Sequence, residues 1–356
     1  MPVVADRLRR AIAAAARGPV ASAAVGTVDR LLPRQRGVLT ILTYHRVDEP
    51  AARPDLMPSL VSATPATFAA QIAMVVRHFD PVSLPEVVAS LDHPTRLPLR
   101  AVLVTFDDGY RDFATNAWPV LRTASVPATL FVATGATDDP SRPFWWDRLW
   151  AAVQRAAGPA PIATPLGALP VGAGHARRTV ATIREWLKTL DHDEAMREVD
   201  RIVDELGDRD GAPPDGELAA TAPAVLGWDE LRTLARQGVT LAPHTRRHPL
   251  LDRVSLGTAV QEIAGSHADL EREVGPIAPI PRVLAYPSGA HGGSAVAAAR
   301  EAGMDLAMTT DRGGNDLRRV DRLRLRRINV GGRAGVPLIR AQMAWAAGLD
   351  ARRSDD

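Results

Sequence analysis

Residues 101–110 read AVLVTFDDGY and indicate the fold class of this chain most directly. Every position from Ala101 to Phe106 is apolar or β-branched, without the polar alternation of a half-exposed strand. This pattern is typical of a parallel strand that is covered on both faces. Two aspartates and a glycine follow at once, and α/β proteins place their active sites where such strands end. The segment therefore predicts a buried parallel strand that leads into a candidate site.

Similar apolar segments recur along the chain, separated by amphipathic ones. The expected strands are Val38–Tyr44, 128–133, 239–242, 283–286, 306–309 and 325–330. The expected helices are 65–79, 85–91, 113–124, 228–237, 257–274, 294–302 and 336–347, the first with Thr64 as its N-cap and Pro65 in its first turn. This alternation predicts βαβ units, either in a barrel or in an open doubly wound sheet.

The alternation is interrupted between about residue 135 and residue 225. This stretch has no clear strand, contains one long helical pattern at 179–206, and carries the aromatic cluster Phe144-Trp145-Trp146 followed by Trp150. We expect a helical insertion over the barrel rim, with the tryptophans mainly in its core. The predicted organisation is an N-terminal extension (1–36), a first scaffold part (37–134), the insertion (135–225), a second scaffold part (226–348) and a polar tail (349–356).

The composition restricts the kinds of function. A formal net charge of +2 and 4% aromatic residues argue against a nucleic-acid partner. The chain has no cysteine, so a metal ion would have to be bound by His, Asp or Glu. Nearly all basic residues are arginine, and Lys188 is the sole lysine.

The first 36 residues resemble a targeting segment only weakly. Arginines precede a short apolar run at 11–16, which Arg17-Gly18-Pro19 then ends. That run is shorter than the apolar core of a secretory signal. We expect a solvated extension on a cytoplasmic protein. A secretory signal, and a basic helix with peripheral membrane or partner contact, are the alternatives left open.

Asp107 and Asp108 are the first candidate site residues. Neighbouring residues on a strand point to opposite faces, so adjacent aspartates can serve different purposes where the strand ends. One carboxylate would bind a cation, and the other would stay free as a base. The alternative is a helix N-cap beside a solvated carboxylate.

His244 and His248 form the second candidate pair, directly after the expected strand 239–242. On a helical turn, residues four apart share one face, a spacing used to hold one divalent metal. With one aspartate they would make a set of two histidines and one carboxylate with open coordination positions, and the nitrogen ligands favour zinc. Histidines that cap a helix or line a polar rim are the alternative.

The third segment, 285–289, reads AYPSG. Here a strand enters a proline–glycine turn that exposes backbone N–H groups. A plain turn at the end of the strand is the simpler interpretation.

Taken together, the order TFDDG, HTRRHP and YPSG resembles the polysaccharide deacetylase family, the NodB-homology carbohydrate esterases. The upstream segment 43–47 (TYHRV) resembles the subgroup that deacetylates poly-N-acetylglucosamine exopolysaccharides. The resemblance covers residues 38–134 and 226–331 and leaves the insertion outside. It implies a distorted (β/α) barrel of about seven strands.

The resemblance also implies roles. Asp107 would be the general base, and Asp108, His244 and His248 the metal ligands. The Ser288 backbone N–H would stabilise the oxyanion while a metal-activated water attacks an acetyl group, with N-acetyl favoured, on an acetylated glycan or glycolipid.

This chain departs from the family pattern in two places. Ala285 occupies the position of an arginine that orients the base, which leaves Arg282 unassigned. The late histidine motif, which supplies the general acid, has no counterpart in 323–330. We therefore expect His45 to be the general acid, near the metal on the side opposite Asp107 and not itself a ligand, with His291 as the alternative.

Two rival functions remain open: a metal-dependent barrel amidohydrolase acting on a small amide, and a non-catalytic glycan-binding relative. A glycosidase that uses the two aspartates is disfavoured, because its carboxylates must stand ~5–9 Å apart.

Overall fold

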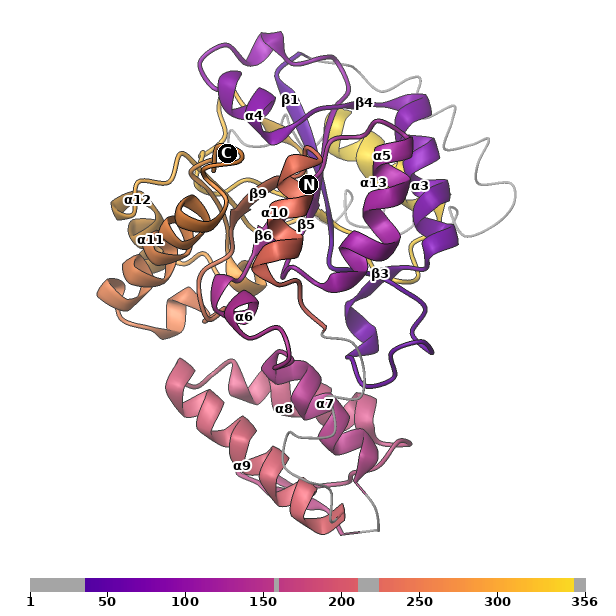
Figure 1. Ribbon diagram of the computed structural model, residues 1–356, viewed down its shortest axis with the longest axis vertical. Helices are drawn as coiled ribbons and strands as arrows, with labels where there is room; N and C mark the ends of the chain where they lie inside the picture. The colour runs from indigo at the N-terminus through magenta and orange to yellow at the C-terminus, as the bar shows by residue number, and fades with distance from the viewer. Residues whose placement is uncertain (1–35, 157–159, 211–223, 349–356) are drawn as a thin grey trace, which may run out of the picture.

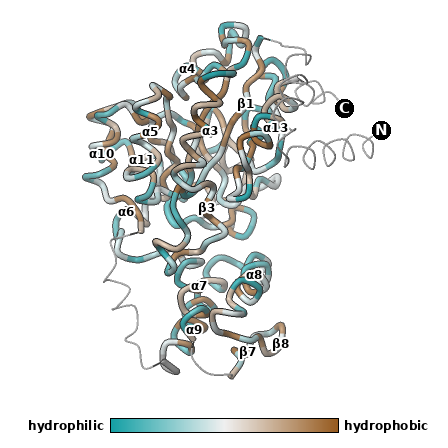
Figure 2. The backbone as a smooth tube through the Cα atoms, turned by 90° about the vertical axis from the view of Figure 1, so that its right-hand side faces the viewer, coloured by the Kyte–Doolittle hydropathy of each residue, from teal (hydrophilic) through white to brown (hydrophobic). Residues whose placement is uncertain are grey.

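The computed structural model describes residues 36–156, 160–210 and 224–348, and it contains an α/β barrel with a helical lobe at one end (Figure 1). The view at right angles places the lobe at the same end (Figure 2). The expected N-terminal extension, apart from its last residue, and the polar tail lie outside the described residues. Within those residues, no helix combines the length and the apolar character needed to cross a bilayer.

Parallel strands form the barrel wall. β1 (Val38–Tyr44) pairs with β5 (Ala101–Phe106), β5 with β6 (Thr129–Val132), and β6 with β9 (Thr240–Pro243). On its other side β1 pairs with β13 (Ile328–Asn329) in parallel and with β12 (Asn315–Asp316) in antiparallel orientation.

A second parallel pair completes the wall. β10 (Val283–Ala285) pairs with β11 (Leu306–Met308), and Met308 bridges to Leu325, just before β13. β9 and β10 lie side by side but belong to separate hydrogen-bonded sheets. The structure is thus the distorted barrel implied by the motifs, and the open doubly wound sheet is excluded.

The strands alternate between an inner and an outer apolar layer. Leu39, Ile41 and Leu103 pack with residues of β6, β9, β10 and β11 in the barrel interior. Leu42 and Tyr44 point outward and pack with the surrounding helices. Both faces of β1 are therefore buried, as its continuous apolar sequence predicted.

Helices cover the outside of the barrel. They are α3 (Pro65–His78), α5 (Trp118–Thr123), α10 (Trp228–Arg236), α11 (Leu256–Glu273), α12 (Gly293–Glu301) and α13 (Val336–Gly348). Shorter elements are α4 (Leu84–Ala89), α6 (Thr134–Asp138), β2 (Arg46–Val47), β3 (Val61–Ala63), β4 (Asp80–Pro81) and the 3-10 helices η1 (Pro58–Leu60), η2 (Pro94–Arg96), η5 (Leu251–Arg253) and η6 (Pro287–Gly289). The Thr64 hydroxyl caps α3 by accepting from the Thr67 N–H, as its sequence predicted.

The expected helix 113–124 is irregular in its first half. η3 (Phe113–Ala117) is a π-helix, in which the Trp118 N–H donates to the Phe113 carbonyl five residues earlier. The next residue, Pro119, has no N–H to continue an α-helical ladder, which explains why the regular pattern begins only in α5.

The lobe contains α7 (Trp145–Arg155), α8 (Ala176–Leu187) and α9 (His192–Asp210). The expectation of no strand in the insertion was wrong, because β7 (Ile162–Thr164) and β8 (Gly167–Leu169) form an antiparallel hairpin. Strands of three residues are too short for a period-2 pattern, and Gly167, at φ 103°, makes the turn possible. The long helical pattern at 179–206 also divides into α8 and α9.

Candidate active site

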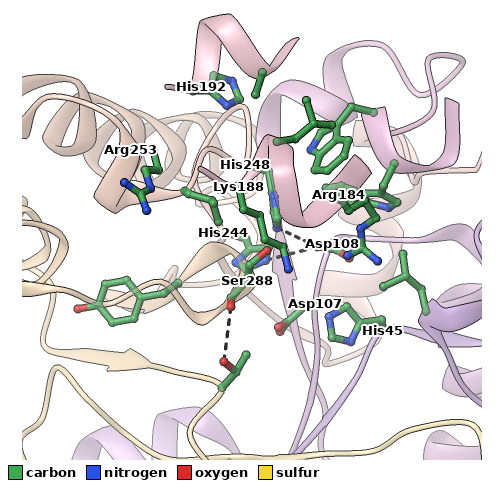
Figure 3. A pocket seen from close by; sticks show the side chains of 18 of the residues that line it. His45, Asp107, Asp108, Arg184, Lys188, His192, His244, His248, Arg253 and Ser288 are labelled. Carbon is green, nitrogen blue, oxygen red and sulfur yellow. Dashed lines mark hydrogen bonds and ion pairs between the residues drawn. The ribbon is translucent and has the colours of Figure 1, made fainter. Parts of the chain in front are cut away.

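Asp108, His244 and His248 form a buried cluster at the carboxyl ends of β5 and β9 (Figure 3). The Asp108 Oδ1 lies 3.4 Å from the His244 Nε2 and 3.5 Å from the His248 Nε2. Ligand atoms of a tetrahedral zinc site, at ~2.0–2.1 Å from the ion, are separated by roughly 3.3–3.4 Å. The donor set and its spacing therefore fit one divalent metal ion.

A hydrogen bond orients the His244 ring toward the cluster, and burial keeps the His248 ring neutral. His244 Nδ1 lies 2.7 Å from the Ala285 carbonyl oxygen, which can only accept, so Nδ1 carries the hydrogen and the Nε2 lone pair faces the cluster. Burial and the neighbouring His244 lower the pKa of His248 to about 3. Burial also lowers the pKa of His244, but the Asp108 carboxylate outweighs this effect and raises it overall.

The histidine pair does not lie on the helical turn that its spacing suggested. Residues 244–250 form a loop, in which Thr245 has φ 65° and His248 has φ 57°. Pro249 disfavours a right-handed helical conformation at His248. The His248 N–H instead donates to the Thr245 Oγ at 3.1 Å, and this local bond brings the two rings together.

Helix α11 and the segment after β6 hold this loop in place. The buried Glu262 accepts from the N–H groups of Arg246 and Arg247, at 3.0 and 2.8 Å. The Gly135 N–H donates to the Arg246 carbonyl at 2.9 Å, and a Cβ on Gly135 would lie only 2.9 Å from that oxygen. A glycine is therefore needed where the insertion begins.

Left-handed backbone conformations concentrate at the site. Five non-glycine residues of the described chain have positive φ, and all but Ser125 lie at the site: Asp108 (75°), Thr245, His248 and Ser288 (53°). Each such conformation costs on the order of 1 kcal/mol or more, so the surrounding structure must impose it. The site geometry is thus built into the backbone.

Asp107 stands outside the metal cluster and is held by Arg327. Both side chains are buried, and the guanidinium Nη1 and Nη2 donate to the two carboxylate oxygens at 2.8 Å each. The Arg327 Nε donates to the Thr309 carbonyl. Burial raises the pKa of Asp107, but Arg327 outweighs this and holds the pKa below its usual value.

Arg327 is the functional residue that the sequence analysis missed. It supplies the guanidinium that Ala285 lacks, and it does so from the segment where no late histidine was found. Arg282 cannot serve, because it precedes β10 and so lies at the amino end of that strand, away from the site. An arginine within the expected strand 325–330 was the available signal.

A cavity of about 250 Å³ opens onto the cluster and the Asp107–Arg327 pair. The barrel contributes His45, Leu60, Leu250, Arg253, Tyr286, Ser288 and Thr310 to its lining. The lobe contributes Trp145, Trp146, Arg184, Leu187, Lys188, Leu190, His192, Ala195 and Met196. The insertion therefore forms one wall of the site at the carboxyl ends of the strands, and His192 is part of that wall.

Trp146 links this wall to the metal cluster. Its ring lies edge-on to the His248 ring, with centroids 4.9 Å apart, and its Nε1 donates to the Tyr110 hydroxyl at 2.7 Å. Tyr110 in turn donates to the buried Asp147 carboxylate at 2.7 Å. Trp146 is thus both core of the lobe and a wall of the cavity.

His45 lines the cavity, but it does not lie on the expected side, opposite Asp107 (Figure 3). Tyr44 pairs in register with Phe106, so His45 follows β1 where Asp107 follows β5 on the neighbouring strand. Figure 3 accordingly shows His45 beside Asp107 and not across the cluster from it. His45 is outside the group of potential metal ligands. His291 lies outside the cavity, with its Nε2 3.3 Å from an Asp311 oxygen.

Ser288 lies at the cavity wall in the turn η6. In the described part of the chain, its backbone N–H has no hydrogen-bond acceptor. Its carbonyl accepts from the Thr310 hydroxyl at 3.5 Å (Figure 3). Gly289, at φ 74°, lies so close to Thr310 that a Cβ would clash with it, so this turn requires a glycine.

Comparison with known proteins agrees with this geometry. The polysaccharide deacetylase family model matches residues 96–163 and 173–307, more than half of the chain. The match includes most of the insertion, which the motifs had left outside the family core. The chain is also similar to the poly-beta-1,6-N-acetyl-D-glucosamine N-deacetylase of Escherichia coli (strain K12), at 30% identity over 100 residues. These residues are 28% of this chain and only 14% of that protein.

Solved structures share the fold. Streptococcus pyogenes deacetylase PplD, in complex with acetate, has a TM-score of 0.57 and 18% identity, over 87% of this chain and 99% of that one. A de-N-acetylase from Aggregatibacter actinomycetemcomitans has a TM-score of 0.55 and 17% identity, over 86% and 99%. The barrel, the order of the motifs and the family match lead to one conclusion: the chain belongs to the polysaccharide deacetylase family, whose members are hydrolases that remove acetyl groups from carbohydrates.

Proposed function

We propose that this protein is a zinc-dependent deacetylase that removes N-acetyl groups from an N-acetylglucosamine-containing polysaccharide. The observation that carries the proposal is that the two adjacent aspartates have different partners. Asp108 belongs to the cluster with His244 and His248, whereas Asp107 lies beside it, ionised and held by Arg327. The name of the E. coli relative supports the choice of N-acetylglucosamine.

The chain's own residues would share the catalytic work. A divalent metal ion in the cluster would polarise the acetyl carbonyl and acidify a water molecule. The Asp107 carboxylate accepts the proton that this water loses, while Arg327 keeps the carboxylate ionised and fixed in orientation. The Ser288 N–H, at the same cavity, donates to the oxygen of the acetyl carbonyl as negative charge develops there.

The leaving amine also needs a proton, and His45 is our candidate for its donor. Its place at the cavity supports this choice, since His45 is half-buried in the lining and does not belong to the metal cluster, although it lies beside Asp107 and not opposite it (Figure 3). An imidazole can donate a proton near neutral pH. His291 is a weaker candidate, because it lies outside the cavity.

Acetate release tests the proposal. Oligosaccharides of β-1,6-linked N-acetylglucosamine are incubated with zinc-loaded protein, with metal-stripped protein and with the stripped protein after zinc is restored. We expect acetate only from the zinc-containing samples, and none from O-acetylated glucose oligosaccharides that lack N-acetyl groups. Equal release with and without metal would contradict the metal dependence, and release from the O-acetyl substrate alone would contradict the choice of N-acetyl.

A further inference from the structure

The wall that the lobe contributes to the cavity is rich in cationic side chains. Arg184 lies on α8, and Lys188, the C-cap residue of that helix, follows one turn later on the same face; Arg253 comes from η5 on the barrel side. Figure 3 shows Arg184 and Lys188 reaching from the lobe toward Asp108 and His244, with Arg253 on the other side of the cluster. None of these residues belongs to the family motifs.

Arg184 is the most informative of the three. Its Nε is buried and has no hydrogen-bond partner in the described part of the chain, and no carboxylate there forms an ion pair with the guanidinium. A buried donor without an acceptor is costly, so such groups are normally satisfied by protein, water or ligand. The guanidinium fork matches the paired oxygens of a carboxylate or a phosphate.

The other two cations are available to a ligand as well. Lys188, the sole lysine of the chain, pairs with Glu185 at 2.7 Å, but Glu185 is 75% exposed and such surface pairs within a helix are weak. Arg253 forms no ion pair within the described residues. Burial and Arg247 lower the pKa of His192, which favours its neutral form.

Among the described residues that line the cavity, no acidic side chain is free to balance these charges. Its acidic residues are Asp107, which Arg327 already neutralises, and Asp108, which belongs to the metal cluster. A bound divalent ion would add further positive charge. A neutral glycan would leave the guanidinium of Arg184 without a counter-charge, whereas an anionic glycan would supply one.

We propose that the natural substrate is an anionic glycan, with an oxyanion group (a carboxylate or a phosphate ester) on the acetylated sugar or on its neighbour, bound by Arg184 with Lys188 and Arg253. This inference rests on the proposed deacetylase function and specifies its substrate class. The insertion, together with Arg253 of the barrel, then selects the substrate.

Kinetics with matched substrates provide the first test. Three N-acetylglucosamine disaccharides are compared with the zinc-loaded protein: one neutral, one with a glucuronate residue and one with a phosphate ester. We expect kcat/KM to be roughly 10- to 100-fold higher for one or both anionic substrates, with an advantage that declines as salt is raised. The anionic substrate with the higher kcat/KM shows whether the oxyanion is a carboxylate or a phosphate ester.

Substitutions on α8 assign this preference to a residue. In Arg184→Gln the ratio of kcat/KM between anionic and neutral substrates should fall to about one, mainly through a higher KM. Arg177→Gln is the matched control, because Arg177 is exposed on the same helix, lies outside the cavity and loses the same charge. This control should keep the wild-type ratio. Equal kcat/KM for all three substrates in the wild type, or an unchanged ratio in Arg184→Gln, would overturn the inference and leave the deacetylase function intact.

A binding measurement separates the inference from the proposed function. Calorimetry follows the binding to zinc-loaded protein of three glucose disaccharides without acetyl groups, again neutral, glucuronate-bearing and phosphate-bearing. If an anionic disaccharide binds more tightly than the neutral one, and this difference is lost in Arg184→Gln, the anion site is supported even if no acetate is released from any substrate. Equal affinities for all three overturn it.

Discussion

Asp107 and Arg327 stand 220 residues apart in the chain and are joined by two hydrogen bonds of 2.8 Å each, both within the buried floor of the cavity. This pairing determines whether the Asp107 carboxyl group is protonated. Burial alone would raise the pKa of this carboxyl, and the guanidinium reverses that effect. The base is therefore kept deprotonated in an environment that would otherwise neutralise it.

Replacing Arg327 with lysine tests this relationship. Lysine keeps the charge but not the two-pronged contact, so it stabilises the carboxylate less and the pKa of Asp107 should rise. Because the base must be deprotonated, the acid limb of the kcat–pH profile should move to higher pH, with kcat at neutral pH reduced more than KM is changed. Arg324→Lys, at a more exposed position, should leave the profile unchanged. If the acid limb does not shift, Arg327 has a structural role only.

Metal content tests the cluster. His244→Ala and His248→Ala should each lose both the bound metal and acetate release, because two remaining ligands hold zinc weakly. Elemental analysis after dialysis should find about one zinc ion per chain in the wild type and in the His291→Ala control, and far less in the two variants. Full metal content in His248→Ala would remove that residue from the site.

The two aspartates should respond differently to the same substitution. Asp108→Asn should lose metal. Asp107→Asn should keep metal, lose nearly all turnover, and be destabilised by about 3–5 kcal/mol because Arg327 is left buried without its counter-charge. The double variant Asp107→Asn/Arg327→Gln should regain stability but not activity, which separates catalysis from folding. Exchanged metal contents between the two single variants would reverse the assignment.

His45→Ala tests the proton donor. The variant should retain metal and lower kcat roughly 10²–10⁴-fold on N-acetyl substrates. The loss should shrink with 4-nitrophenyl acetate, whose leaving group departs without a proton. An equal loss on both substrates would indicate a structural role, and an unchanged kcat would exclude His45 from the mechanism.

The local sequence pattern was sufficient to predict much of the fold. The continuous apolar sequence of β1 and β5 predicted both strands with their observed bounds, because residues covered on both faces leave no polar alternation. The positions of Asp107, Asp108, His244 and His248 after strands predicted that their side chains would meet at one edge, since parallel strands end on the same side. The resemblance in motifs added the distorted barrel, and the structure agrees.

Other features depend on contacts between distant segments, which no local pattern encodes. The pairing of Arg327 with Asp107 exists only because β13 and β5 flank β1 in the closed wall. His45 lies beside Asp107 because their strands are hydrogen-bonded neighbours in register, a relation that the order of the motifs does not reveal. The cationic wall of Arg184 and Lys188 arises from the packing of the lobe over the strand ends. The sequence by itself determined which residue types the site contains and which strands bear the main motifs, because both follow from local chemistry. Only the tertiary structure decided which side chains face each other across the cavity, because that depends on strand order, register and the placement of the insertion.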